Sequence, residues 1–117
     1  MSLHWEEADG VGIARPAGPE LAADSASAFR TEMAGRLTGT NWVVIDLDDV
    51  RFMDSSGLGA VVSVLKGLRG RGELRLCGVS PQVEALFRLT KMLNVLPIEA
   101  TREAAVASLQ RSREAAA

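Results

Sequence analysis

The sequence reads WVVIDLDDVRFMDSSGLG from Trp42 to Gly59. Its first part, Trp42 to Leu47, is a nearly continuous apolar run rich in β-branched residues, which is typical of a strand buried on both faces. Asp54 and Ser55 are residue types that cap helix N-termini, and apolar side chains follow them at helical spacing. These are Leu58, Val61, Val62, Leu65 and Leu68, and Gly70 and Gly72 end the pattern. The stretch therefore predicts a central strand, a loop and a helix that begins at Asp54 or Ser55.

The residues before this stretch predict a hairpin and a first helix. Apolar and polar residues alternate on either side of Asp9-Gly10, so we expect two short antiparallel strands joined by a turn. The prolines of the segment 15–19 have no backbone N–H to donate to a neighbouring strand, which predicts a loop there. Helical spacing then connects Leu21, Ser25, Ala28, Phe29, Met33 and Leu37, and Gly39 in the C′ position is expected to end this helix.

The residues after the stretch predict two further strands and two further helices. Leu74, Leu76 and Val79 indicate a second buried strand. Ser80-Pro81 is typical of a helix start, and the stripe Val83, Leu86, Phe87 and Leu89 predicts a third helix that ends near Asn94. A short strand from Val95 to Ile98 and a last helix, capped by Thr101 and burying Val106 and Leu109, are expected to complete the chain.

The predicted order of elements is ββαβαβαβα, which belongs to the α/β class. Strands that alternate with helices imply right-handed crossovers, so the sheet should be parallel in its second half and antiparallel at its start. We therefore expect a single-domain sandwich of four helices on a mixed β-sheet. The domain should span residues 1–113, and the alanine-rich end, 114–117, should be a frayed tail.

Composition excludes several function classes. Thirteen basic and fifteen acidic residues give a net charge of -2, so we expect no nucleic-acid partner. No apolar run is long enough to span a membrane, and the N-terminus lacks the pattern of a secretory signal. The single cysteine, Cys77, excludes an internal disulfide, and with the single histidine, His4, it cannot form a four-ligand zinc site. These features favour a cytoplasmic protein without a metal or cofactor.

The junction after the central strand is the place where an α/β protein would carry a catalytic motif. No lysine completes a phosphate-binding Walker loop, and Gly57-Leu58-Gly59 lacks the third glycine of a dinucleotide fingerprint because position 62 is Val62. Met53 stands where a nucleophile elbow needs glycine. Asp46 and Asp48 resemble the opening motif of haloacid-dehalogenase-type phosphatases, but no later acidic pair would hold magnesium. We therefore expect no enzyme activity, and we interpret these two aspartates as solvated strand ends.

Ser55 has two interpretations from local pattern alone. A serine at a helix start ordinarily supplies ~1 kcal/mol of capping. However, Gly57 and Gly59 stand in the first turn of the helix, where each costs up to ~1 kcal/mol relative to alanine, so something should approach this backbone closely. A kinase active site, a docking helix or packing against a neighbouring strand would each explain the glycines.

The segment from Val44 to Gly59 resembles the core signature of the STAS domain, as found in bacterial anti-sigma factor antagonists. The resemblance extends over nearly the whole chain, in the same order of elements. In that family the first serine after the aspartate accepts a phosphoryl group from a partner kinase that is also the anti-sigma factor, which implies Ser55 as the phosphorylation site and Ser56 as its neighbour. The partner would be a serine kinase of the histidine-kinase-like ATPase type. A PP2C-type phosphatase is a further candidate partner.

The resemblance also implies a partner-binding surface. We expect it to include Asp54, Ser56, Gly57, Leu58, Gly59 and Val62 from the helix, together with Gly18, Glu20, Leu21 and Ala22 from the loop before the first helix. The family usually carries Gly-x-Leu-Asp in that loop, whereas this chain has Gly18-Pro19-Glu20-Leu21-Ala22. The usual acid is therefore missing, and Glu20 or Asp24 could take its place.

A phosphate on Ser55 would add a charge of about -1.5 to -2 beside Asp54, and the helix amides would partly compensate it. The fold should tolerate this charge, whereas a partner packed against it should be released. The alternative is a STAS scaffold or accessory subunit that is never phosphorylated, for example in a transporter-associated complex.

Overall fold

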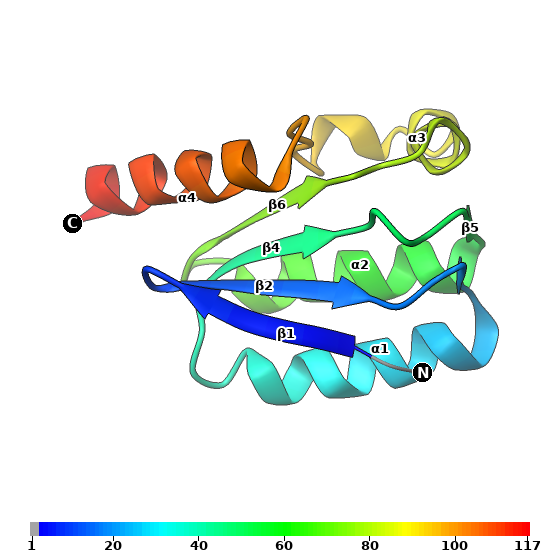
Figure 1. Cartoon of the computed structure of the whole chain (residues 1–117), viewed down its shortest axis with the longest axis horizontal. Coiled ribbons are helices and arrows are strands. Elements are labelled where there is room, and N and C mark those ends of the chain that lie inside the picture. The colour runs from blue at the N-terminus through cyan, green and yellow to red at the C-terminus, as the bar shows by residue number, and fades with distance from the viewer. Residues whose placement is uncertain (1–2) are drawn as a thin grey trace.

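The structure is a computed structural model that describes residues 3–117; Met1 and Ser2, with which the predicted domain begins, lie outside the described residues (Figure 1). The described strands are β1 (Leu3–Ala8), β2 (Val11–Pro16), β3 (Glu20–Leu21), β4 (Trp42–Asp46), β5 (Phe52–Met53) and β6 (Glu73–Cys77). The helices are α1 (Ala23–Arg36), α2 (Ser55–Leu68), α3 (Pro81–Leu89), the 3-10 helix η1 (Met92–Asn94) and α4 (Arg102–Ala116).

The main sheet has the strand order β1-β2-β4-β6. β1 pairs antiparallel with β2, while β4 pairs parallel with β2 on one side and with β6 on the other. Asp9 and Gly10 have φ angles of 54° and 82°, which suit the two-residue turn of a tight hairpin. The predicted mixed sheet, the opening hairpin and the central strand are thus confirmed.

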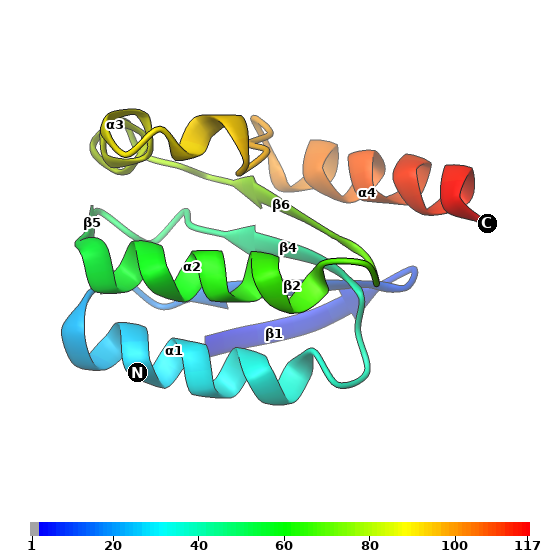
Figure 2. The ribbon, with the colours of Figure 1, turned by 180° about the vertical axis from the view of Figure 1, so that it is seen from behind.

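Helices cover both faces of this sheet. Successive strand residues point to opposite faces, so Val43 and Ile45 pack in the larger buried cluster with α1 and α2, while Val44 packs with Ala105 and Leu109 of α4. Figure 2 shows α1 and α2 side by side in front of the sheet, and both helices begin at the same end of the molecule. The central strand is therefore buried on both faces, as its composition predicts.

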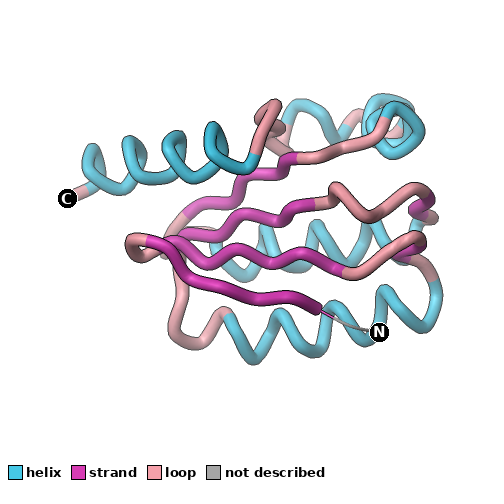
Figure 3. The backbone as a smooth tube through the Cα atoms, viewed as in Figure 1, coloured by secondary structure: helices cyan, strands magenta, loops and turns pink. Residues whose placement is uncertain are grey.

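A second, very short sheet lies beyond one end of the main sheet (Figure 3). In it β3 pairs parallel with β5, with Glu20 opposite Phe52 and Leu21 opposite Met53. Neither strand was predicted, because two-residue strands carry no periodicity. Leu21 lies in β3, so the first helix begins at Ala23 and not at Leu21.

Several predicted boundaries were wrong. Arg15 and Pro16 belong to β2; the pairing of β2 with β4 extends only as far as Ala14, so β4 needs no N–H from the proline. The segment 95–98 forms one bridge, Leu76 to Ile98, and not a strand. Gly39 does not adopt a positive φ, since α1 ends at Arg36. α4 continues to Ala116, where a frayed tail from Glu114 was expected.

The buried helix faces also differ from the predicted stripes. In α2 the fully buried residues are Gly57, Ala60, Val61, Val64 and Leu68, while Leu58, Val62 and Leu65 are half-buried. Ala28 is exposed on α1, and Leu89 is 82% exposed at the end of α3. The third helix ends at Leu89, and η1 follows after Lys91 at a positive φ of 62°. In α4, Leu109 is buried as predicted, but Ala105 takes the place of Val106, which is half-buried.

Within residues 3–117, none of the helices has both the length and the apolar composition needed to cross a membrane.

Candidate functional site

Ser55 is the first residue of α2, and its side chain is exposed. The N-cap is Asp54, whose carboxylate accepts a hydrogen bond from the main-chain N–H of Gly57 at 3.0 Å. The structure gives the Ser55 hydroxyl no hydrogen bond to any residue between 3 and 117. Of the two predicted caps, Asp54 is therefore the one used, and the Ser55 hydroxyl is not needed to cap the helix.

Gly57 is buried, and its lack of a side chain has an internal cause. A Cβ atom at this position would lie 1.9 Å from the carbonyl oxygen of Leu21 and 2.6 Å from Cγ of Met53. β3 and β5 can therefore close onto the first turn of α2 only because residue 57 is glycine. Among the three explanations for the glycines, the structure assigns Gly57 to packing against a neighbouring strand.

The loop before β3 is bonded to the segment before α2. The carbonyl of Pro19 accepts hydrogen bonds from the N–H groups of Arg51 and Phe52, at 2.7 and 3.1 Å. A Cβ atom at Gly18 would lie 1.5 Å from the carbonyl oxygen of Asp49, so the two backbones touch there. Because of these contacts, the two parts of the predicted binding surface, far apart in sequence, lie side by side next to Ser55.

Most of the predicted binding residues reach the solvent, but two do not. Ser56, Gly18 and Glu20 are exposed, and Asp54, Leu58, Gly59, Val62 and Ala22 are half-buried. Leu21 and Gly57 are buried. These two residues lie beneath the surface and support it. They were expected to contact a partner directly, but they are not available for such contact.

Ala22 occupies the N-cap of α1 without a side-chain cap of its own. Ser25 compensates: its hydroxyl accepts from the N–H of Ala22 at 3.0 Å and lies 3.1 Å from the carbonyl of Glu20. The start of α1 therefore holds together without the loop acid that the family usually has. Glu20 and Asp24 are both exposed at this position.

Comparison with known proteins identifies the family. The sequence model of the STAS domain matches residues 2–105. The chain belongs to the STAS domain family. A Bordetella bronchiseptica protein, BtrV, named as a candidate anti-sigma factor antagonist, is 35% identical over 112 residues, with 94% of this chain and 96% of BtrV covered. The anti-sigma F factor antagonist of Paenibacillus polymyxa is 31% identical over 101 residues, which cover 84% of this chain and 86% of that protein.

The same fold is found in a solved structure of a phosphorylated protein. The Bacillus cell fate determinant SpoIIAA in its phosphorylated form superposes on this STAS domain with a TM-score of 0.71 and 22% sequence identity, covering 92% of this chain and 98% of SpoIIAA. The relatives by sequence are named as antagonists of anti-sigma factors. The STAS domain is thus a member of the anti-sigma factor antagonist family.

Phe52 is a surface residue of the STAS domain that the sequence pattern did not predict. It is 54% exposed, although it is a large apolar side chain. Its neighbour Met53 is buried, because the two residues of β5 point to opposite sides. The polarity of Arg51, Phe52 and Met53 does not alternate, so the sequence pattern gave no signal that Phe52 is exposed.

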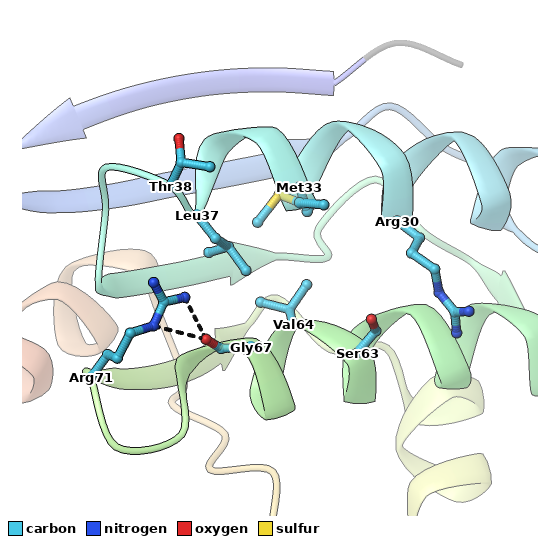
Figure 4. Close-up of a pocket in the computed structure, with 9 residues that line it drawn as sticks. Arg30, Met33, Leu37, Thr38, Ser63, Val64, Gly67 and Arg71 are labelled. Atoms are coloured by element: carbon cyan, nitrogen blue, oxygen red, sulfur yellow. Dashed lines mark hydrogen bonds between the residues drawn. The ribbon is translucent and has the colours of Figure 1, made fainter.

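A groove runs between α1 and α2 of the STAS domain, with a volume of about 270 Å³ (Figure 4). Met33, Leu37 and Val64 line it with apolar surface, and Ser63 and Gly67 contribute from α2. Ser63 is half-buried. Figure 4 shows Arg30 and Arg71 at opposite ends of the groove; Arg71 donates to the carbonyl of Gly67, while Arg30 extends from α1 toward α2.

Asp46 of the STAS domain is not a solvated strand end, because its side chain is only 6% exposed. Its carboxylate accepts from the N–H of Asp48 and from the guanidinium of Arg102, both at 3.0 Å. Burial lowers the pKa of Arg102, but the hydrogen bond and charge of Asp46, together with Glu6, outweigh this and raise it. Asp46 therefore joins α4 to the sheet, so it is not free to act as the nucleophile of a phosphatase.

Proposed function

We propose that this STAS domain is a phosphorylatable protein-interaction switch. In its unmodified form it binds an anti-sigma factor that is also a serine kinase of the histidine-kinase-like ATPase type. Phosphorylation of Ser55 then releases that partner, and a PP2C-type phosphatase resets the switch. The protein acts in the cytoplasm, without nucleic acid, membrane, metal or cofactor of its own.

The observation that carries the proposal is the uncommitted hydroxyl of Ser55. The hydroxyl is exposed, and the capping that a serine would ordinarily provide comes from Asp54. A phosphoryl acceptor must be reachable by the active site of the kinase and must not be needed to hold the fold. Ser55 meets both conditions, and the phosphorylated SpoIIAA shows that a protein of this fold can carry a phosphate.

The chemistry of the transfer belongs to the kinase. The Ser55 Oγ forms a bond to the γ-phosphorus of ATP while the bond from that phosphorus to the bridging oxygen of ADP breaks. The hydroxyl proton passes to a base of the kinase, and ADP leaves with magnesium. This chain supplies only the acceptor hydroxyl, so we propose no catalytic role for any of its residues.

Release follows from electrostatics. The phosphate adds about -1.5 to -2 charge next to the Asp54 carboxylate. A like-charged pair formed at 4 Å between this phosphate and an acidic group of the bound partner costs about 4 kcal/mol at an effective dielectric near 20, which lowers affinity by roughly a thousandfold. The added charge lies on the surface, so the domain itself need not refold.

The surface beside Ser55 offers the partner an apolar anchor. Exposed aromatic side chains are common energetic centres of interfaces, and Phe52 presents one three residues before the acceptor. Gly18 and Glu20 lie in the loop that is bonded to the same segment. We therefore place the partner over Phe52, Ser55 and this loop.

Purified kinases of the histidine-kinase-like ATPase type from the source organism provide the test. Each is incubated with the domain, ATP and magnesium, and the products are mapped by mass spectrometry. We expect one kinase to add a single phosphate at Ser55, and the modified protein to lose its binding to that kinase. Phosphate at Ser56 would contradict Ser55 as the acceptor, and no phosphate with any kinase would favour the unphosphorylated scaffold.

A further inference from the structure

Arg30 places a positive charge beside the helix that carries Ser55. Its Nη2 atom lies 3.4 Å from the position that a Cβ atom of Gly59 would occupy. Five other arginines form ion pairs, namely Arg15, Arg36, Arg75, Arg88 and Arg102. For the guanidinium of Arg30, neither an ion pair nor a hydrogen bond is found among residues 3–117. The guanidinium is therefore held near α2 without an acidic partner.

Gly59 and Ser55 are neighbours on the surface of α2. Residues four apart lie on one face of a helix, with about 5–6 Å between their Cβ positions. The turn between them is open, because Gly59 has no side chain, and both Ser55 and Arg30 are exposed. The guanidinium of Arg30 therefore lies beside the face of α2 that Gly59 shares with Ser55.

The direction of the arginine agrees with this geometry. Side chains of helices lean toward the helix N-terminus, and α1 and α2 begin at the same end of the molecule (Figure 2). In Figure 4 the Arg30 side chain descends from α1 to α2 on the side of Ser63 away from Gly67, which is the side nearer to the start of α2.

We propose that Arg30 binds the phosphate on Ser55. This inference rests on the proposed phosphorylation and adds the residue of this chain that recognises the modified state. A planar guanidinium forms charge-assisted, two-pronged hydrogen bonds with a phosphate. Arg30 offsets part of the new charge within the domain and holds the phosphate toward the opening between α1 and α2. The phosphorylated form thereby has a defined surface that differs from the unmodified one.

The test needs no kinase. Phosphoserine is incorporated at position 55 during synthesis with an expanded genetic code, and the second pKa of the phosphate is measured by ³¹P NMR titration. A nearby cation favours the dianion, so we expect this pKa to be about 0.5 lower with Arg30 than in Arg30→Gln. The difference should shrink in 1 M salt, and Arg30→Lys should retain part of it.

Arg36→Gln is the matched control. Arg36 lies on the same helix, but its guanidinium carbon lies over the ring of Trp5, 5.3 Å from the ring centroid. Removal of the Arg36 charge should therefore leave the phosphate pKa unchanged. Thermal melting of each variant verifies the fold. An equal phosphate pKa in wild type and Arg30→Gln would overturn the inference, as would an equal effect of Arg36→Gln.

The two proposals fail separately. If no kinase modifies Ser55 but the titration shows the effect of Arg30, the proposed function is wrong and the phosphate site of the fold stands. If a kinase phosphorylates Ser55 and is released while the titration shows no effect, the switch stands and Arg30 has no part in it.

Discussion

The carboxylate of Asp54 accepts a hydrogen bond from the N–H of Gly57 at 3.0 Å, so the capping side chain of α2 stands directly before Ser55. Asp54 provides the stability of the helix start. Ser55, one residue later, is left with an exposed hydroxyl that the fold does not use. Modification of Ser55 can therefore change the surface without changing the fold.

Replacement of the cap should separate these roles in a stability measurement. We expect Asp54→Ala to lower the free energy of unfolding by ~1 kcal/mol, because an N-cap hydrogen bond is lost. Asp54→Ser should keep most of it, and Ser55→Ala should be almost neutral. Urea denaturation provides the values. A loss at Ser55→Ala as large as that at Asp54→Ala would mean that Ser55 shares the capping.

The two glycines of the first turn should respond in opposite directions. Gly57→Ala places a methyl group 1.9 Å from the carbonyl oxygen of Leu21, so we expect a loss of about 2 kcal/mol or more. Gly59→Ala meets only the flexible end of Arg30 at 3.4 Å and should stabilise the helix by ~0.5 to 1 kcal/mol. Thermal or urea denaturation of both variants decides this. Equal effects would contradict the packing of β3 against α2.

Variants of Ser55 should distinguish the switch from a passive scaffold. Ser55→Ala should keep its affinity for the cognate kinase but accept no phosphate. Ser55→Asp adds one charge where phosphate adds nearly two, so it should weaken binding partially and leave the melting temperature almost unchanged. Calorimetric affinities test this, with Ser56→Ala as the control that still accepts phosphate. Wild-type affinity of Ser55→Asp would refute the repulsion mechanism.

Two leucines of α2 offer a matched test of the buried face. Leu68 is buried, so Leu68→Ala should cost about 2 to 5 kcal/mol. The sequence pattern predicts the same loss for Leu65→Ala, but Leu65 is only half-buried, and we now expect a clearly smaller loss. The free energies of unfolding in urea rank the two. A larger loss at Leu65 would mean that the face of α2 is rotated from the one described.

Alkaline pH should destabilise the protein through Cys77. Burial, with the charge of Asp46 next in importance, raises the pKa of this thiol from 9.0 to about 12. Above pH 9 the unfolded chain releases the thiol proton while the folded protein keeps it, so this contribution to stability declines from pH 9 up to about 12. Urea denaturation between pH 8 and 10.5 should show a steeper decline in wild type than in Cys77→Ala. Equal slopes would contradict the raised pKa.

Local pattern alone was sufficient for the order of the main elements and for the starts of α2, α3 and α4. The apolar run at Trp42 to Leu47 predicts a central strand because only a strand between two layers can bury both of its faces. The caps at Ser80 and Thr101 are those predicted, since a cap depends on a side chain and an N–H three residues away. The motif at Ser55 likewise predicts the family, because its residues are contiguous.

Only the tertiary structure decided which residues of the candidate site meet. β3 and β5 are two residues each, and they exist because Gly57 lets Leu21 approach α2 and because Pro19 bonds the backbone before Met53. Asp46 is neutralised by Arg102, 56 residues further along the chain. Arg30 reaches Gly59 only because α1 packs against α2. These contacts join residues that are distant in the chain. A local sequence pattern does not show which distant residues meet in space, whereas packing and charge pairing depend on that meeting.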